Sequence, residues 1–230
     1  MNKKFFIFNL MLLYTFAAIQ ATDIFTKNGD KIITNKQFIQ LGSNSNGPTS
    51  SPMDINTYKD YILNTPNKKY QYHVKLGGSS PNMPQSGTYD VLTITDAAGN
   101  ILLRRWGCDP LYTTKHLTAR QDQNSHFIQI PLDDDTFALI FAGWLYYYED
   151  IAGEMIIIIV HKDEATLVFD RPAASYSYTP VPNFSIEFIE EVGGLIDDFG
   201  NLQATSNALS TRTKHKIWKE GNMLKYKSWN

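Results

Sequence analysis

Aromatic side chains are the residues of this chain with the clearest capacity to recognise a ligand. Trp144, Tyr146 and Tyr148 alternate along an apolar segment and share one face if that segment is a strand. Tyr176 and Tyr178 likewise share one face of a segment that runs into two prolines. A row of such rings stacks on sugars or peptides, although the same rings also fill the core between sheets. The four tyrosines lie near strand ends and loops, so we take them as candidate binding residues.

Basic side chains concentrate near the C-terminus of a chain whose net charge is −2. Residues 212–227 contain six basic side chains and one acid, and Lys214, Lys216 and Trp218 fall on one face of a predicted strand. This pattern suits contact with an acidic protein, a phosphate-rich envelope surface or a polyanionic glycan. The alternative is that lysines on an edge strand prevent sheets from pairing edge to edge. We add these three residues to the candidate binding residues.

Compact catalytic motifs are absent from the sequence. It has no G-x-S-x-G elbow, no H-E-x-x-H, no phosphate-binding or dinucleotide-binding glycine loop and no C-x-x-C, and its five histidines are scattered singly. We therefore predict no catalytic residue, no metal site and no cofactor. A secreted hydrolase with dispersed catalytic residues, acting for example on a glycan, stays open because catalytic groups need only meet in space.

Two sets of acidic residues and one thiol each have a structural and a chemical interpretation. Asp133-Asp134-Asp135 could bind calcium, but the spaced acids and the glycine of a calcium loop are missing, which favours a solvated turn. Glu190-Glu191 and Asp197-Asp198 could form a glycosidase pair, yet adjacent strand residues point to opposite faces, which favours solubilising charge. Cys108 is the only cysteine, so no intramolecular disulfide is possible and a small buried residue is expected.

The first 21 residues have the pattern of a secretory signal peptide. Lys3 and Lys4 precede an apolar stretch from Phe5 to Phe16, and Ala21 ends a run suited to cleavage. The apolar stretch is too short to span a bilayer, so no transmembrane anchor is expected and the cleaved chain should be secreted or periplasmic and soluble. The remaining chain carries 19 basic and 23 acidic side chains, which argues against nucleic acid as a partner.

Strand periodicity dominates the chain after residue 70. Tyr72, Val74 and Leu76 alternate with polar residues that face water or an opening, and 137–148 and 155–160 are apolar on both faces, as in adjacent central strands. Short glycine-containing turns at Asp96 to Asn100, Gly193-Gly194 and Gly221-Asn222 are expected to join successive strands as hairpins, which makes these strands antiparallel. One helix is expected after Ser51 and Pro52, with Ile55, Tyr58 and Ile62 on its apolar face.

These patterns predict an all-β fold with one short N-terminal helix. The arrangement expected is an antiparallel β-sandwich or a partly closed barrel, with a small four-bladed propeller as the alternative. Residues 1–21 form the signal peptide, 22–52 an N-terminal arm with a flexible linker, and 53–230 the β-rich domain. The expected function is that of a secreted or periplasmic binding protein, and the alternative is the dispersed-site hydrolase.

Overall fold

The computed structural model describes residues 21–38, 56–78, 89–111, 127–147, 150–172, 175–192, 195–196, 202–203 and 211–229. The predicted signal sequence up to residue 20 and the linker after Leu41 lie outside these residues. The described chain is almost entirely β-strand, with one short 3-10 turn, η1, at Lys36–Phe38. None of the helices in the described part is long and apolar enough to cross a bilayer.

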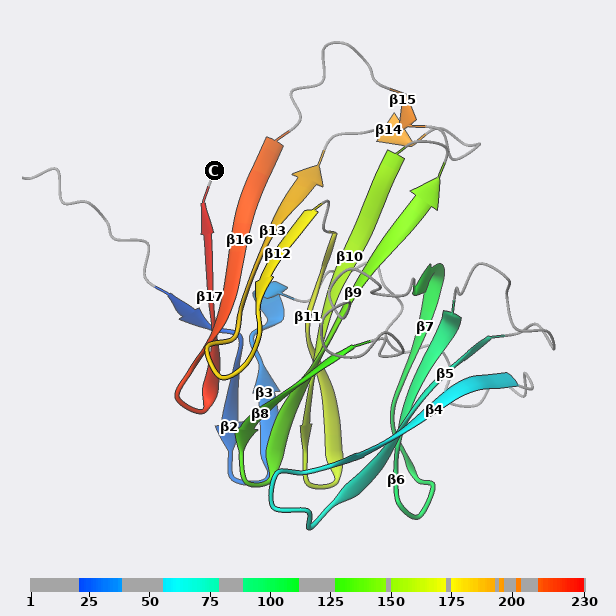
Figure 1. The fold of residues 1–230 in the computed structure, drawn as a ribbon, viewed down its shortest axis with the longest axis vertical. Coiled ribbons are helices and arrows are strands. Elements are labelled where there is room, and N and C mark those ends of the chain that lie inside the picture. Colours follow the sequence, from blue (N-terminus) through cyan, green and yellow to red (C-terminus); the bar gives the residue numbers. More distant parts are fainter. Residues whose placement is uncertain are drawn as a thin grey trace, which may run out of the picture.

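Three antiparallel sheets form the body of the molecule (Figure 1). The first sheet has the order β4-β5-β6-β7, the middle sheet the order β11-β10-β9-β8, and the last sheet the order β1-β17-β16-β13-β12. The strands of the first sheet are β4 (Asn56–Asn64), β5 (Gln71–Gly78), β6 (Tyr89–Asp96) and β7 (Ile101–Leu111). Those of the middle sheet are β8 (Ile128–Asp133), β9 (Thr136–Tyr147), β10 (Asp150–His161) and β11 (Glu164–Pro172).

The last sheet joins the two ends of the described chain. Its strands are β1 (Thr22–Asp23), β12 (Ser175–Thr179), β13 (Ser185–Val192), β16 (Thr211–Glu220) and β17 (Met223–Trp229). Two small hairpins complete the fold, β2 (Phe25–Asn28) with β3 (Lys31–Thr34), and β14 (Leu195–Ile196) with β15 (Leu202–Gln203). The N-terminal strand β1 pairs with β17, so the start of the described chain is fixed to its end.

The middle sheet is covered on both faces, which explains the apolar runs in its sequence. Ile156, Ile158 and Val160 of β10 belong to the core shared with the first sheet, here called the first core. Met155 and Ile157 of the same strand belong to the second core, shared with the last sheet and the β2-β3 hairpin. All five side chains are fully buried. The prediction that 137–148 and 155–160 form adjacent central strands is confirmed over the described residues, since β9 pairs with β10 from Thr136 to Tyr147.

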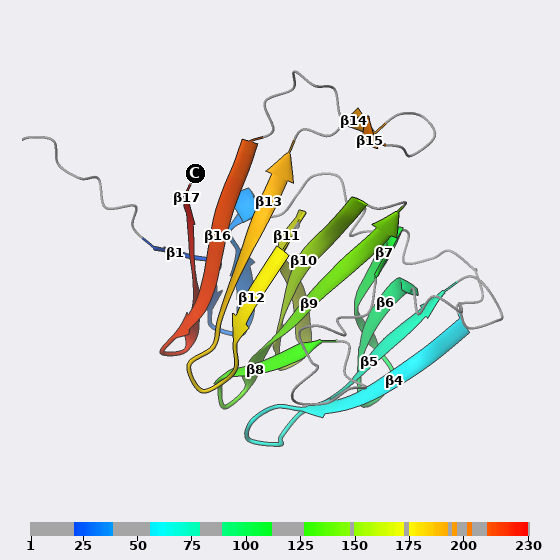
Figure 2. The ribbon, with the colours of Figure 1, turned by 45° about the horizontal axis from the view of Figure 1, so that its top comes forward.

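The three sheets form one layer more than the two layers of a simple β-sandwich. Figure 2 shows the three sheets face to face in sequence, with the middle sheet between the other two. None of the sheets in the described residues closes on itself, so the partly closed barrel was wrong. The sheets also stack as layers, which differs from the blades of the four-bladed propeller. The all-β, antiparallel character predicted from the sequence is confirmed.

The predicted N-terminal helix was wrong over the residues that the structure describes. Residues 56–64 form strand β4, which pairs with β5. Tyr58, Tyr61 and Leu63 pack against the first core, whereas Ile62, expected on the buried face of the helix, is 59% exposed. A bulge between Thr57 and Lys59 shifts the register, so the buried positions do not alternate strictly and resemble helical spacing. Pairing with β5 outweighs the local helix-start signal.

The hairpin turns predicted at Asp96 to Asn100 and at Gly221-Asn222 are confirmed, and the structure adds a third at Asn28-Gly29-Asp30 between β2 and β3. Gly29, Gly99 and Gly221 have φ angles of +61°, +89° and +58°, the left-handed region that glycine enters at little cost. The predicted turn at Gly193-Gly194 lies outside the described residues.

Candidate binding faces

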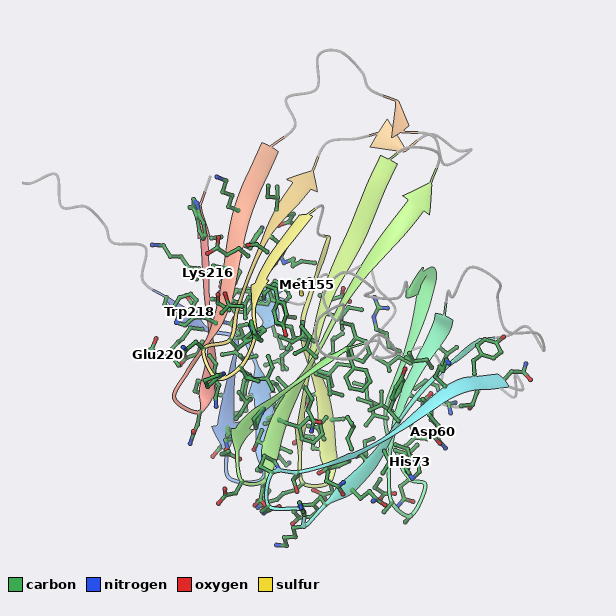
Figure 3. All side chains as sticks on the ribbon, viewed as in Figure 1. Asp60, His73, Met155, Lys216, Trp218 and Glu220 are labelled. Atoms are coloured by element: carbon green, nitrogen blue, oxygen red, sulfur yellow. The ribbon has the colours of Figure 1, made fainter. Side chains whose placement is uncertain are left out.

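Lys214, Lys216 and Trp218 lie on one face of β16, as predicted. Their neighbours His215 and Ile217 point the other way and are buried toward the second core. The three residues therefore lie on the outer face of the last sheet, which is the face turned away from the middle sheet. Figure 3 shows Lys216, Trp218 and Glu220 along this side of the molecule, away from Met155 in the middle sheet. The register brings Lys225 of β17 next to Trp218, and Lys227 next to Lys216.

Some of these side chains on the outer face have local partners. Nζ of Lys216 donates to Oε1 of Glu187 at 2.8 Å, and Nε1 of Trp218 donates to Oε2 of Glu220 at 3.2 Å. Lys225 pairs with Asp23 at 2.7 Å. Lys214 and Lys227 have no acidic partner within the described part of the chain. Among the described side chains of this face, Lys214 and Lys227 are therefore the cations without an acidic partner.

The alternative explanation of these lysines, protection of a sheet edge, does not fit their position. Strand β16 lies between β13 and β17 and pairs with both, so it is an interior strand of the last sheet. Its backbone donors and acceptors are already used by its neighbours, so a second chain finds no template there. Edge protection was the wrong explanation for Lys214 and Lys216.

Among the candidate tyrosines, the structure describes the side chain of Tyr178 alone. Tyr178 of β12 is half-buried, packs against the second core and lies 6.3 Å, centroid to centroid, from Phe184. Its burial raises the pKa of its hydroxyl. Residue 176 follows the same strand, and residues 144 and 146 belong to β9, but the structure does not describe their side chains. Tyr148 lies outside the described residues. Tyr178 is thus a core-packing residue.

A buried series of polar contacts through His215 is, among the described residues, the arrangement that most resembles a catalytic relay. Nε2 of His215 lies 2.9 Å from Oε2 of Glu190, and its Nδ1 lies 2.7 Å from Oη of Tyr226. The contact with His215 is the main cause that lowers the pKa of the Glu190 carboxyl, and Arg171 adds to it. The His215 ring stacks on Phe188 at 4.8 Å inside the second core. These contacts between Glu190, His215 and Tyr226 join β13, β16 and β17 within the core and contribute to packing.

The three aspartates of the β8–β9 turn connect neighbouring turns. Lys27 of β2 donates to Asp133, and the backbone N–H of Asn67 donates to the carbonyl of Asp134 at 3.1 Å. The side-chain amide of Asn67 also donates to Asp135. The described residues hold no group of three or more His, Cys, Asp or Glu suited to a metal ion. The carboxylates of Asp133 and Asp135 and the backbone carbonyl of Asp134 therefore connect the turns at this end of the fold.

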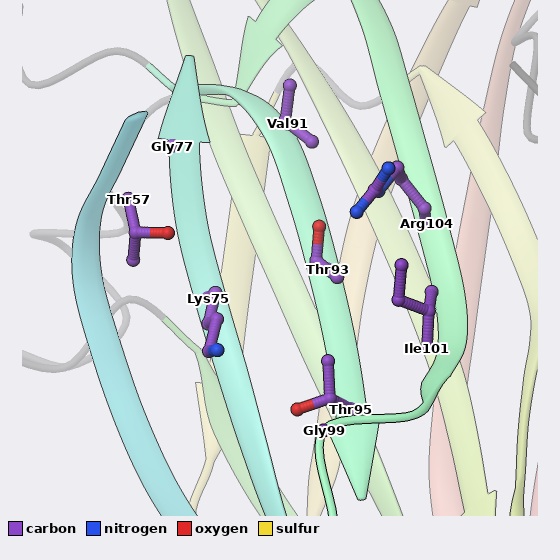
Figure 4. Close-up of a pocket in the computed structure, with 9 residues that line it drawn as sticks. All are labelled: Thr57, Lys75, Gly77, Val91, Thr93, Thr95, Gly99, Ile101 and Arg104. Atoms are coloured by element: carbon purple, nitrogen blue, oxygen red, sulfur yellow. The ribbon is translucent and has the colours of Figure 1, made fainter. Parts of the chain in front are cut away.

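A hollow of about 230 Å³ lies on the face of the first sheet that points away from the middle sheet (Figure 4). Leu92 and Ile94 of β6 belong to the first core, so the alternate residues Thr93 and Thr95 point into this hollow. The remaining lining residues are Thr57, Lys75, Gly77, Val91, Gly99, Ile101 and Arg104. Two cationic side chains therefore face a small cavity with several hydroxyl groups.

The sequence patterns did not single out this hollow. The alternation around Tyr72, Val74 and Leu76 did predict a polar face that includes Lys75, and that face is observed. The pair Thr93 and Thr95 on one side of β6 was the remaining sequence signal. Arg104 could not be placed beforehand, since only the pairing of β6 with β7 brings it opposite Thr93.

No protein-family model matches this chain, and no curated protein or solved structure matches it significantly either. Function is therefore inferred from the geometry of these two faces.

Proposed function

We propose that this protein is an exported binding protein that holds an acidic glycan on the outer face of the last sheet. The observation that carries the proposal is the combination of Lys214 and Lys227, which lack an acidic partner among the described residues, with the Trp218 ring on the same face. The signal-peptide pattern of the first 21 residues supports export.

The mixture of charge and aromatic surface favours a glycan among acidic partners. Trp218 is only partly buried and offers a flat ring on which a sugar can stack. The ammonium groups of Lys214 and Lys227 lie on the same face and attract carboxylate or sulfate groups along a polysaccharide. The rigid, paired strands fix these three side chains in relation to one another, which lowers the entropy lost on binding.

The test is capture of the purified chain on three immobilised polymers. We expect retention on dextran sulfate, none on neutral dextran, and weaker retention on polyglutamate, which has charge but no sugar rings. Retention on dextran sulfate should fall steeply between about 50 and 300 mM salt, because screening weakens attraction between exposed charges. Equal retention on dextran sulfate and polyglutamate would replace the glycan with an acidic protein as the partner, and no retention on either would reject the proposal.

A further inference from the structure

From the hollow on the first sheet we infer that the protein has a second binding site, which takes the oxyanion of a small molecule, a carboxylate or a phosphoryl group, between Lys75 and Arg104. This site lies on the opposite side of the first sheet from the first core and is independent of the lysines of the last sheet.

The strand register places the two cations on either side of one threonine. Lys75 of β5 is opposite Thr93 of β6, and Thr93 is opposite Arg104 of β7. Cross-strand partners point to the same face, so both cationic side chains rise from one row of the sheet, with backbones about 10 Å apart. Side chains of this length reach a single anion held between them. A carboxylate or phosphoryl group would accept charge-assisted hydrogen bonds from both.

No acidic side chain of the described residues lines the hollow. The carboxylate opposite Lys75 in the register is that of Asp60 on β4. Its Oδ1 lies 3.0 Å from Nδ1 of His73, and no ion pair joins it to Lys75. Figure 3 shows Asp60 and His73 side by side on the first sheet. Neither Lys75 nor Arg104 therefore forms an ion pair with a described side chain, and a bound anion would supply that partner.

Thr95 provides the second, independent observation. Its side chain is 4% exposed, lines the hollow, and its Oγ1 has no hydrogen-bond partner among the described residues. Nε of Arg104 is also buried without a partner there. A buried hydroxyl or guanidinium N–H without a partner costs free energy, so such groups are rare in folded proteins. An oxyanion in the hollow would accept hydrogen bonds from both groups.

The size of the hollow limits the ligand. At about 230 Å³ it is smaller than the 300–1,000 Å³ typical of drug-sized ligands. Val91 and Ile101 add an apolar border on which a short carbon chain can pack. Lysine and arginine bind both carboxylate and phosphoryl groups, so the geometry indicates the oxyanion itself and the experiment must separate the two.

The experiment measures the melting temperature of the full chain against concentration of inorganic phosphate or sodium acetate, at constant ionic strength set with sodium chloride. We expect a saturable rise with at least one of the two anions, because a ligand that binds the folded state stabilises it. Lys75→Gln combined with Arg104→Gln should weaken the apparent affinity at least tenfold. A response to phosphate alone assigns the site to a phosphoryl group, and a response to acetate alone assigns it to a carboxylate.

Thr95→Val separates binding from folding. Because Oγ1 of Thr95 bonds to no described residue, the isosteric valine should leave the melting temperature without anion unchanged or raise it, while weakening anion affinity about tenfold. The matched control is Lys59→Gln, which removes an exposed lysine on the adjacent strand β4 that does not line the hollow, and it should bind as the wild type does. The inference is overturned if neither anion gives a saturable rise, or if the control loses affinity as much as the double variant.

Discussion

Nη2 of Arg105 lies 3.4 Å from Oδ2 of Asp170, and this ion pair connects the first sheet to the middle sheet. The two side chains are 2% and 1% exposed, so both charges are removed from water. Arg105 comes from β7, and Asp170 comes from β11, at the sheet edges that meet beside the first core. Burying two charges has a large desolvation cost that their attraction roughly offsets, so the pair specifies how the two sheets dock more than it adds net stability.

Removal of one partner of this pair should be strongly destabilising. We expect Asp170→Leu to lower the free energy of unfolding by about 3–5 kcal/mol, because the Arg105 charge stays buried without its carboxylate. The double variant Arg105→Met with Asp170→Leu should recover most of that loss, since the buried charge of Arg105 is then removed together with that of Asp170. Urea unfolding of the three proteins measures both values. A double variant that is less stable than Asp170→Leu would contradict this account.

The buried His161 should make stability depend on pH. It is 5% exposed, its Nδ1 lies 2.7 Å from Oγ1 of Thr136, and burial is the main cause that lowers its pKa, with Lys27 and Lys162 adding to the shift. In the unfolded chain the histidine pKa is about 6.5, so the unfolded chain binds a proton at a pH at which His161 of the folded chain is still neutral. The free energy of unfolding should therefore decrease as the pH falls below about 6.5, by at most about 1.4 kcal/mol per pH unit.

The variant His161→Gln keeps a polar group near Thr136 but does not titrate. Its free energy of unfolding should change less than that of the wild type between pH 7.5 and 5.5, measured by urea unfolding at each pH. This range stays above the region where Glu190, whose pKa is lowered, begins to take up a proton and lose its stabilising contact with His215. The same pH dependence in both proteins would show that another group is responsible.

Charge reversal on the last sheet tests the glycan face. Lys214→Glu with Lys216→Glu should weaken capture on dextran sulfate, and so should Lys214→Glu with Lys227→Glu, which spares the Lys216–Glu187 pair. The second double variant should change the melting temperature less, because the first places like charges opposite each other across β13 and β16. Lys31→Glu with Lys59→Glu, two exposed lysines on other strands, makes the same change in net charge and should bind as the wild type does. Equal capture by all three variants would assign no role to this face.

Cleavage of the signal sequence gives a further expectation. The exported chain should begin at Thr22, the residue after the small side chain of Ala21. Thr22 is also the first residue of β1, which pairs with Tyr226 of β17, so cleavage there leaves the last sheet complete. Mass spectrometry of the exported protein determines its first residue. Retention of Lys3 and Lys4 would contradict this prediction.

The pattern of apolar and polar residues along each segment was sufficient to predict most of the strands. The two-sided apolar character of β9 and β10 predicted central strands, and Gly99 and Gly221 predicted two of the observed hairpins, because burial and φ angle depend on neighbouring residues. The same local logic failed at residues 56–64, where capping residues indicate a helix but pairing with β5 imposes a strand.

The sequence by itself determined the all-β class, the antiparallel hairpins and the face of β16 on which Lys214, Lys216 and Trp218 lie, since all three follow from alternation along the chain. Only the tertiary structure decided that three sheets stack in layers, that β16 is an interior strand, and that Arg104 and Lys75 flank Thr93. The physical reason is that strand order and sheet docking depend on contacts between residues far apart in sequence, which the periodicity of a single segment does not encode.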